Sequence, residues 1–167
     1  SIASKLPFTT STLQQEAFAR LKFKTKKTTA LAQKLYEGID VGGEHMGLIT
    51  YIRTEDTRLS STFVNRAVNF ISESIGKDYL DQTKVKKALK ESGNSALPHE
   101  AIRPASNHRT PESVKQYLTN DLYELYKMIY NRALAALMKP RKDEVLTILL
   151  QSGEYQFKME FARTVFQ

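Results

Sequence analysis

The chain has 167 residues, of which 41% are hydrophobic, and it contains no cysteine. This length suits a single domain, with room for a small appendage, and the apolar fraction supports a packed core. The lack of cysteine excludes disulfides and thiolate metal sites, and it makes a reducing, cytoplasmic location the expectation. The three widely spaced histidines do not form a zinc site, and no apolar run is long enough to span a membrane or to act as a signal.

Basic residues outnumber acidic residues by 25 to 18, which gives a net charge of +7. Many of them gather in two clusters, one from Arg20 to Lys27 and one from Lys84 to Lys90. A basic excess attracts polyanions such as nucleic acid without specifying which one. Each cluster taken alone is equally compatible with an ordinary solvated surface.

Apolar spacing and capping residues predict three helices in the first half of the chain. The first begins near Ser11, and its core stripe contains Leu13, Ala17 and Leu21 with Phe18 alongside. The second runs from Thr25 to Gly38, a residue type that often ends helices. The third begins at Ser60 or Ser61 and ends at Gly76. Its expected buried positions are Phe63 or Val64, Ala67, Phe70 or Ile71, and Ile75.

Between the second and third helices, the segment from Ile39 to Met46 contains two adjacent glycines and is predicted to be a turn or loop. The segment from Gly47 to Ile52 is predicted to be a short strand with Tyr51 at its end. After the third helix, Lys77 to Leu97 is polar and basic, so we expect a loop with at most one turn of helix. The prolines at both ends of Pro98 to Pro104 favour a rigid segment that presents His99, Glu100 and Arg103.

The last third of the chain contains two predicted helices and a hairpin. Thr110 and Pro111 are suited to the cap and first position of a short helix. A strong apolar stripe predicts a long helix from about Thr119 to Met138. After Pro140, the segments from Val145 to Leu150 and from Tyr155 to Phe166 are predicted to be two strands joined by a turn that contains glycine.

The pattern T-Y-I-R suggests phosphodiester chemistry. In an extended backbone, Tyr51 and Arg53 lie on the same side, because side chains alternate between faces. The planar arginine fork binds phosphate oxygens in pairs, and tyrosine can form covalent intermediates. Taken alone, the same pattern also fits an ordinary packing tyrosine in a half-buried strand.

Several blocks of the sequence resemble type IA DNA topoisomerases. The block G-L-I-T-Y-I-R-T-E-D-T is similar to the active-site signature of that family. The other blocks follow in the matching order: P-F-T-T-S-T-L-Q-Q-E-A from Pro7, T-A-L-A-Q-K-L-Y-E-G from Thr29, P-H-E-A-I-R-P from Pro98 and L-Y-K-M-I-Y-N-R from Leu125. The resemblance implies a mainly α fold with short strands, of winged-helix-like type. It also implies an active-site tyrosine domain over residues 1–139 and part of a hinge domain, as a β-hairpin, over residues 140–167.

The resemblance also implies a reaction and roles for named residues. Tyr51 matches the nucleophile that cuts single-stranded DNA and forms a 5′-phosphotyrosyl bond, and a second strand passes through the gap before ATP-independent religation. Arg53 matches the arginine that contacts the scissile phosphate. We expect Glu100 to position its neighbours. Further DNA contacts are expected from His99, Arg103, Lys26, Lys27 and Thr50.

The family also supplies groups from outside the matched region. A separate Toprim domain provides a glutamate and an acidic cluster that binds Mg²⁺, and this chain has no D-x-D pattern. We therefore expect a fragment that has no metal site of its own, works with the Toprim and hinge domains of the same enzyme, and is inactive when isolated. The hairpin, separated from its sheet, is expected to favour self-association.

The sequence departs from the family pattern at two places. Glu55-Asp56 stands where the family usually has Asp-Ser, and Leu97-Pro98 stands where a more polar pair is common. Two other classes of function stay open on the residues alone. One is a noncatalytic winged-helix module that binds nucleic acid, with Tyr51 in a packing role, and the other is a helical protein-interaction domain.

Overall fold

The structure, a computed structural model, describes residues 4–93, 97–140 and 142–166. The chain divides into two compact units, Lys5–Met138 and a smaller one formed mainly by Lys139–Gln167, and each is described by itself. The division into functional domains between residues 139 and 140 remains a prediction. Among the described residues, no helix combines the length and apolar character that a membrane crossing needs.

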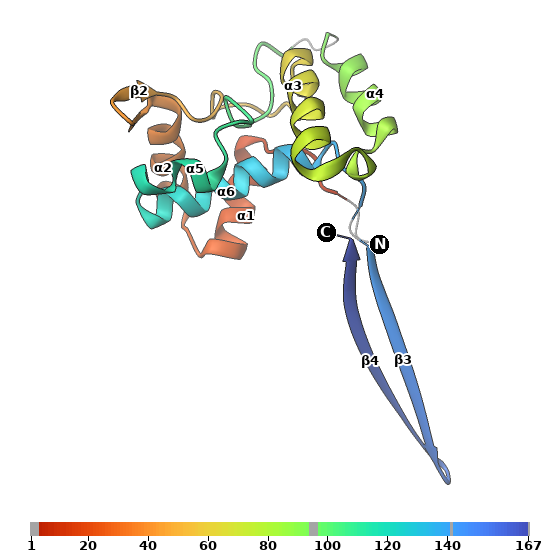
Figure 1. Cartoon of the computed structure of the whole chain (residues 1–167). Helices are drawn as coiled ribbons and strands as arrows, with labels where there is room; N and C mark the ends of the chain where they lie inside the picture. The colour runs from red at the N-terminus through yellow and green to blue at the C-terminus, as the bar shows by residue number, and fades with distance from the viewer. Residues whose placement is uncertain (1–3, 94–96, 141, 167) are drawn as a thin grey trace. The chain divides into compact units, whose positions relative to one another are not determined.

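The larger unit is mainly helical, as predicted (Figure 1). Most of the helices start where a hydroxyl or carboxylate can accept the first free backbone N–H groups, whereas the helix that begins at Thr25 has no side-chain cap. Thr9, Ser60, Thr110 and Thr119 provide such caps, and Thr9 and Thr12 form a reciprocal capping box. The α-helices of the described chain are α1 (Thr10–Leu21), α2 (Thr25–Glu37), α3 (Ser61–Ile71), α4 (Gln82–Glu91), α5 (Pro111–Val114) and α6 (Asn120–Ala135). A π-helical turn, Ser72–Gly76, continues α3 to the predicted end at Gly76, and short 3₁₀ helices cover Lys77–Tyr79 and Lys115–Tyr117.

Helix α6 forms the centre of the core and packs on α1, α2 and α5 (Figure 1). Its residues Leu125, Ile129 and Ala133 are completely buried. Tyr126 and Tyr130 on the same helix are also buried, and their hydroxyls donate to the backbone carbonyls of Arg109 and Asn107. Burial raises the pKa of both phenols, to about 12 for Tyr130, so they remain hydrogen-bond donors at neutral pH. These tyrosines are therefore structural.

Three predictions about local structure were wrong. The segment 39–46 is a small hairpin, β1 (Ile39–Val41) paired antiparallel with β2 (Glu44–Met46), because Gly42 and Gly43 have the positive φ angles of a tight turn. Residues 77–97 include the ten-residue helix α4, because Asp81 caps it by accepting from the N–H groups of Thr83 and Lys84. The long side chains of its lysines are good helix formers, so its basic composition does not oppose the helix.

The third error concerns residues 47–52, which form an extended segment and not a regular strand. Its pairing is limited to an isolated antiparallel bridge between Ile49 and Pro104, and proline cannot donate to a strand ladder. Two side chains also lie differently from the prediction. Phe18 is 60% exposed and Ile75 is 43% exposed, because neither falls on the buried face of its helix. The main stripe of α1 is confirmed at Leu13 and Ala17.

The smaller unit is a two-stranded antiparallel ribbon, which confirms the predicted hairpin (Figure 1). Strand β3 (Lys142–Ser152) pairs with β4 (Tyr155–Phe166), and Gly153 adopts a positive φ in the turn. Residues opposite each other in the register share a face, since side chains alternate along each strand. One face therefore carries almost only apolar side chains: Leu146, Ile148, Leu150, Tyr155, Phe157, Met159 and Phe161.

Candidate active site

The segment that carries Tyr51 is held on one side by Thr10, the first residue of α1. The N–H of Thr10 donates to the carbonyl of Thr54 at 2.8 Å, and the Thr10 hydroxyl donates to the carbonyl of Ile52 at 2.7 Å. The same hydroxyl accepts from the N–H of Thr54 at 2.9 Å. One threonine thus fixes the backbone on the C-terminal side of Tyr51.

The other side of the segment is held by residues 101–105. The N–H of Thr50 donates to the carbonyl of Arg103 at 3.0 Å, and its hydroxyl donates to the carbonyl of Ala101 at 2.8 Å. The N–H of Arg103 in turn donates to the Thr50 hydroxyl at 3.0 Å. Thr50 was predicted to contact DNA, and its hydroxyl is here used to fix the backbone beside Tyr51.

The ring of Tyr51 is half-buried between two other aromatic rings. Its centroid lies 4.5 Å from that of His99 and 5.5 Å from that of Tyr36 at the end of α2. The Tyr36 ring meets it edge-on, at an interplanar angle of 68°. These contacts restrict the rotation of the Tyr51 ring. His99 itself is exposed, so it is available to a ligand at this point.

Arg53 is exposed and lies where three hollows of the surface meet. The first is an open groove of about 630 Å³ that is also lined by Tyr51 and Lys26. A second, of about 400 Å³, is lined by His99, and a third lies between α1 and α2. Within the described residues, no carboxylate forms an ion pair with Arg53. Its guanidinium is therefore available to an anion in the groove.

The two lysines that were predicted to bind DNA point to different places. Lys26 lines the groove with Tyr51 and Arg53. Lys27 forms an ion pair with Asp121 at 2.7 Å, and its ammonium lies 4.1 Å from the centre of the Phe23 ring. The structure therefore brings Tyr51, Arg53 and Lys26 together and places Lys27 in an internal contact.

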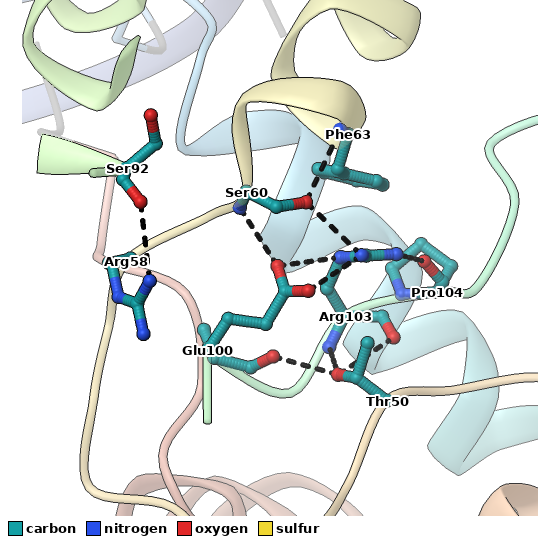
Figure 2. A network of polar contacts seen from close by, with 9 residues as sticks. Thr50, Arg58, Ser60, Phe63, Ser92, Glu100, Arg103 and Pro104 are labelled. Atoms are coloured by element: carbon teal, nitrogen blue, oxygen red, sulfur yellow. Dashed lines mark hydrogen bonds and ion pairs between the residues drawn. The ribbon is translucent and has the colours of Figure 1, made fainter. Parts of the chain in front are cut away.

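Arg103 and Glu100 form a partly buried network below this surface (Figure 2). The guanidinium donates twice to the Glu100 carboxylate, at 2.7 and 2.9 Å, and also to Pro104 O and Ser60 Oγ. The carboxylate also accepts from the N–H of Ser60 at 2.8 Å. Burial alone would raise the pKa of Glu100, but its bonds to Arg103 and Ser60 outweigh this and lower it.

This geometry bears on the predicted role of Arg103 as a DNA contact. Four of the five N–H donors of its guanidinium are used inside the protein. Its plane also lies over the Phe63 ring, 4.7 Å from the centroid. A DNA contact from Arg103 remains a prediction, and the geometry favours a positioning role alongside Glu100.

The comparisons with known proteins agree with the blocks quoted from the sequence. A family model described as DNA topoisomerase matches residues 1–167. The chain belongs to the DNA topoisomerase family. Its structure is also similar to that of full-length topoisomerase I from Thermotoga maritima in a monoclinic crystal form, with a TM-score of 0.75 and 38% sequence identity. That match covers 99% of this chain and 26% of the Thermotoga chain, so the present chain spans about a quarter of its length.

The departures from the topoisomerase pattern have partners within the chain. The Asp56 carboxylate accepts from Arg58 Nε at 2.9 Å, and Arg58 also donates to the carbonyls of Ser92 and Leu97. Figure 2 shows the contact with Ser92. Glu55 accepts from the Ser11 hydroxyl at 3.0 Å. The carboxylate at position 56 thus holds Arg58, which in turn contacts Ser92 and Leu97.

Sequence reasoning about this topoisomerase chain missed three residues that shape the site: Thr10, Tyr36 and Arg58. Thr10 and Tyr36 lie in blocks that carry the family resemblance, but nothing local to them indicates a contact with Tyr51 or its neighbours. The described residues include no group of three or more His, Cys, Asp or Glu side chains that could hold a metal ion.

Proposed function

We propose that this chain is the tyrosine-bearing part of a type IA topoisomerase, which relaxes negatively supercoiled DNA through a transient single-strand break. One observation carries the proposal: the half-buried Tyr51 lies in a groove with the exposed Arg53, which has no ion-pair partner in the described part of the chain, and the chain is of the topoisomerase family. A phenol next to a free guanidinium suits attack on a phosphodiester.

In the proposed reaction, the Tyr51 hydroxyl oxygen attacks the phosphorus of a single-stranded DNA phosphodiester. The new bond joins the tyrosine oxygen to phosphorus, and the bond from phosphorus to the 3′ oxygen breaks. The tyrosine proton leaves, and the departing 3′ oxygen takes up a proton. The phosphate ester is kept as a phosphotyrosyl bond, so religation by the 3′ hydroxyl needs no ATP. Arg53 offsets charge on the phosphate oxygens during both steps.

Other groups of the chain prepare this step. The hydrogen bonds of Thr10 and Thr50 hold the backbone on either side of Tyr51, which keeps the nucleophile in place before DNA arrives. Lys26 adds positive charge to the groove, and His99 is placed to contact the strand beside the Tyr51 ring. The proton donor for the 3′ oxygen and Mg²⁺ are proposed to come from a Toprim domain of the same enzyme, outside this chain.

The deciding experiment uses the longer enzyme that carries this chain, with a labelled single-stranded oligonucleotide that is denatured after incubation. We expect a covalent adduct with the natural protein and none with Tyr51→Phe, while DNA binding changes little. Arg53→Ala should weaken both binding and adduct formation. Tyr155→Phe, on the exposed hairpin, serves as a matched control that keeps the adduct. Binding without any adduct from the natural enzyme would contradict the proposal and favour a noncatalytic nucleic-acid module.

The isolated chain gives a second comparison. We expect it to bind single-stranded DNA weakly, with an affinity that falls as salt rises, since phosphate contacts release counterions. It should form no adduct, because a missing general acid alone typically lowers rates by about 10² to 10⁴. An adduct formed by this chain alone would show that the groups needed for cleavage lie within the chain and not in a separate domain.

A further inference from the structure

A pocket of about 230 Å³ lies between α1 and α2, directly beside the groove of Tyr51. Thr29 and Arg53 line both the pocket and the groove, so a strand in the groove passes the mouth of the pocket. We infer that the pocket receives one nucleobase of the strand whose phosphate is bound by Arg53. This inference rests on the proposed function of the groove.

The size and walls of the pocket suit a single base. Sites for drug-sized ligands usually measure roughly 300–1,000 Å³, so this smaller pocket fits a flat group of a few atoms. Leu13, Ala32 and Ile52 give it apolar walls against which a base can pack. These three side chains offer no donor to a phosphate, whereas Arg53, which lines the pocket and the groove, does. The chemistry therefore places the phosphate at Arg53 and the base inside.

Gln14 offers the groups that would read the edge of the base. Its Nε2 donates to the Thr29 hydroxyl at 3.2 Å, and that hydroxyl donates to the carbonyl of Thr25 at 3.0 Å. This chain of bonds fixes the amide and leaves one N–H and the carbonyl oxygen with no partner among the described residues. A donor beside an acceptor is the pair that glutamine uses to recognise a base, most often adenine.

A second polar group of the pocket also lacks a partner. Thr28 is completely buried, and its hydroxyl forms no hydrogen bond within the described part of the chain. Such groups are usually paired, with protein or with water. This oxygen is covered in the empty pocket, so a polar ligand would reach it only if the side chains that cover it shift.

The direct test is a titration of the 167-residue chain with single-stranded homo-oligonucleotides of four nucleotides. The NMR signals of the glutamine side-chain amides are recorded during the titration. We expect the Gln14 amide resonance to move, most with the adenine oligonucleotide, while that of the exposed Gln15 stays in place. Gln14→Leu removes the assigned signal and should reduce the preference between homopolymers by roughly tenfold. Gln15→Leu is the matched control and should leave the preference unchanged.

Movement of the groove resonances of Lys26 and Arg53 without movement of the Gln14 amide would overturn the inference.

In the longer enzyme, cleavage positions are then mapped on a randomised single-stranded library. We expect a base preference at one position near the cut, lost in Gln14→Leu and kept in Gln15→Leu. Equal cleavage maps for the natural enzyme and Gln14→Leu would overturn the inference and leave the proposed function intact. Absence of any adduct would contradict the proposed function, and the NMR result would still decide the pocket.

Discussion

Arg53 and Arg103 show how the surroundings of one residue type decide its use. Arg53 is exposed, has no ion-pair partner among the described residues, and lines hollows on three sides. Arg103 is largely buried and donates to a carboxylate, a carbonyl and a hydroxyl. An arginine with free donors can bind a phosphate from solution. An arginine such as Arg103, whose donors already bind acceptors within the protein, instead holds the polypeptide around the site.

The Glu100–Arg103 pair leads to a prediction about stability. Glu100→Gln should lower the free energy of unfolding at neutral pH by about 1–3 kcal/mol, since Arg103 loses a charged acceptor. The folded-state pKa of Glu100 is lowered, so its contribution is fully present above the ordinary glutamate pKa of about 4.3 and is lost as pH falls through the lowered pKa. Urea unfolding of both proteins between neutral and acidic pH measures this difference.

The control for this series is Glu44→Gln, because Glu44 is exposed on β2. Its unfolding free energy should match that of the natural chain at every pH. If the difference in unfolding free energy between Glu100→Gln and the natural chain stays constant down to the most acidic pH values, the ionic origin of the effect is contradicted.

At the scale of elements, the predictions that succeeded rest on local signals. The start of α6 follows from Thr119, and the start of α5 from Thr110 and Pro111, because a cap acts within one turn of helix. The extended form of residues 47–52 depends on contacts with residues 101–105, far away in the sequence. Pro104 is visible in the sequence, but no local pattern indicates that it pairs with Ile49. A regular strand was therefore predicted for residues 47–52.

The residues of the candidate site also divide into those with a local sequence signal and those placed by contacts between distant segments. The pattern T-Y-I-R indicated Tyr51 and Arg53, and both line the same groove. Tyr36, Thr10 and Arg58 reach the site only because the fold brings separate segments together. Their contributions could not be predicted from spacing along the chain.

Helix α4 was missed, and its cap offers a test of why it forms. Asp81 accepts from two backbone N–H groups of the first turn, and its own N–H donates to the carbonyl of Leu137. Asp81→Ala keeps the backbone bond and removes the cap, so it should cost about 1 kcal/mol of unfolding free energy. Chemical denaturation followed by circular dichroism measures the cost. The exposed Asp78→Ala is the control, and an equal effect of both variants would contradict the capping role.

At the scale of the whole molecule, the smaller unit presents an unusual surface. Leu146, Leu150 and Phe157 lie on one face of the β3–β4 ribbon, and each is more than half exposed. An isolated two-stranded hairpin is at best marginally stable in water, and its open strand edges can pair with another chain. This face therefore favours contact between copies of the chain when no other domain covers it.

We predict that the chain self-associates at high concentration through this apolar face. Sedimentation velocity should show a sedimentation coefficient that rises with concentration. Phe157→Lys places a charge on the apolar face and should abolish the rise. Thr147→Lys places the same charge on the opposite face and should leave it largely intact. A natural chain that stays monomeric up to millimolar concentration would contradict the prediction.

The hydrogen bonds around Tyr51 also have a consequence for folding kinetics. They join residues 10, 50–54 and 101–105, so Tyr51 is fixed only after two segments that are distant in the sequence have met the middle of the larger unit. Contacts between residues so distant in sequence form slowly, since large loops must close first. A newly made or partly unfolded chain therefore carries its tyrosine in an unaligned state. Folding therefore delays the alignment of the proposed nucleophile until the larger unit is complete.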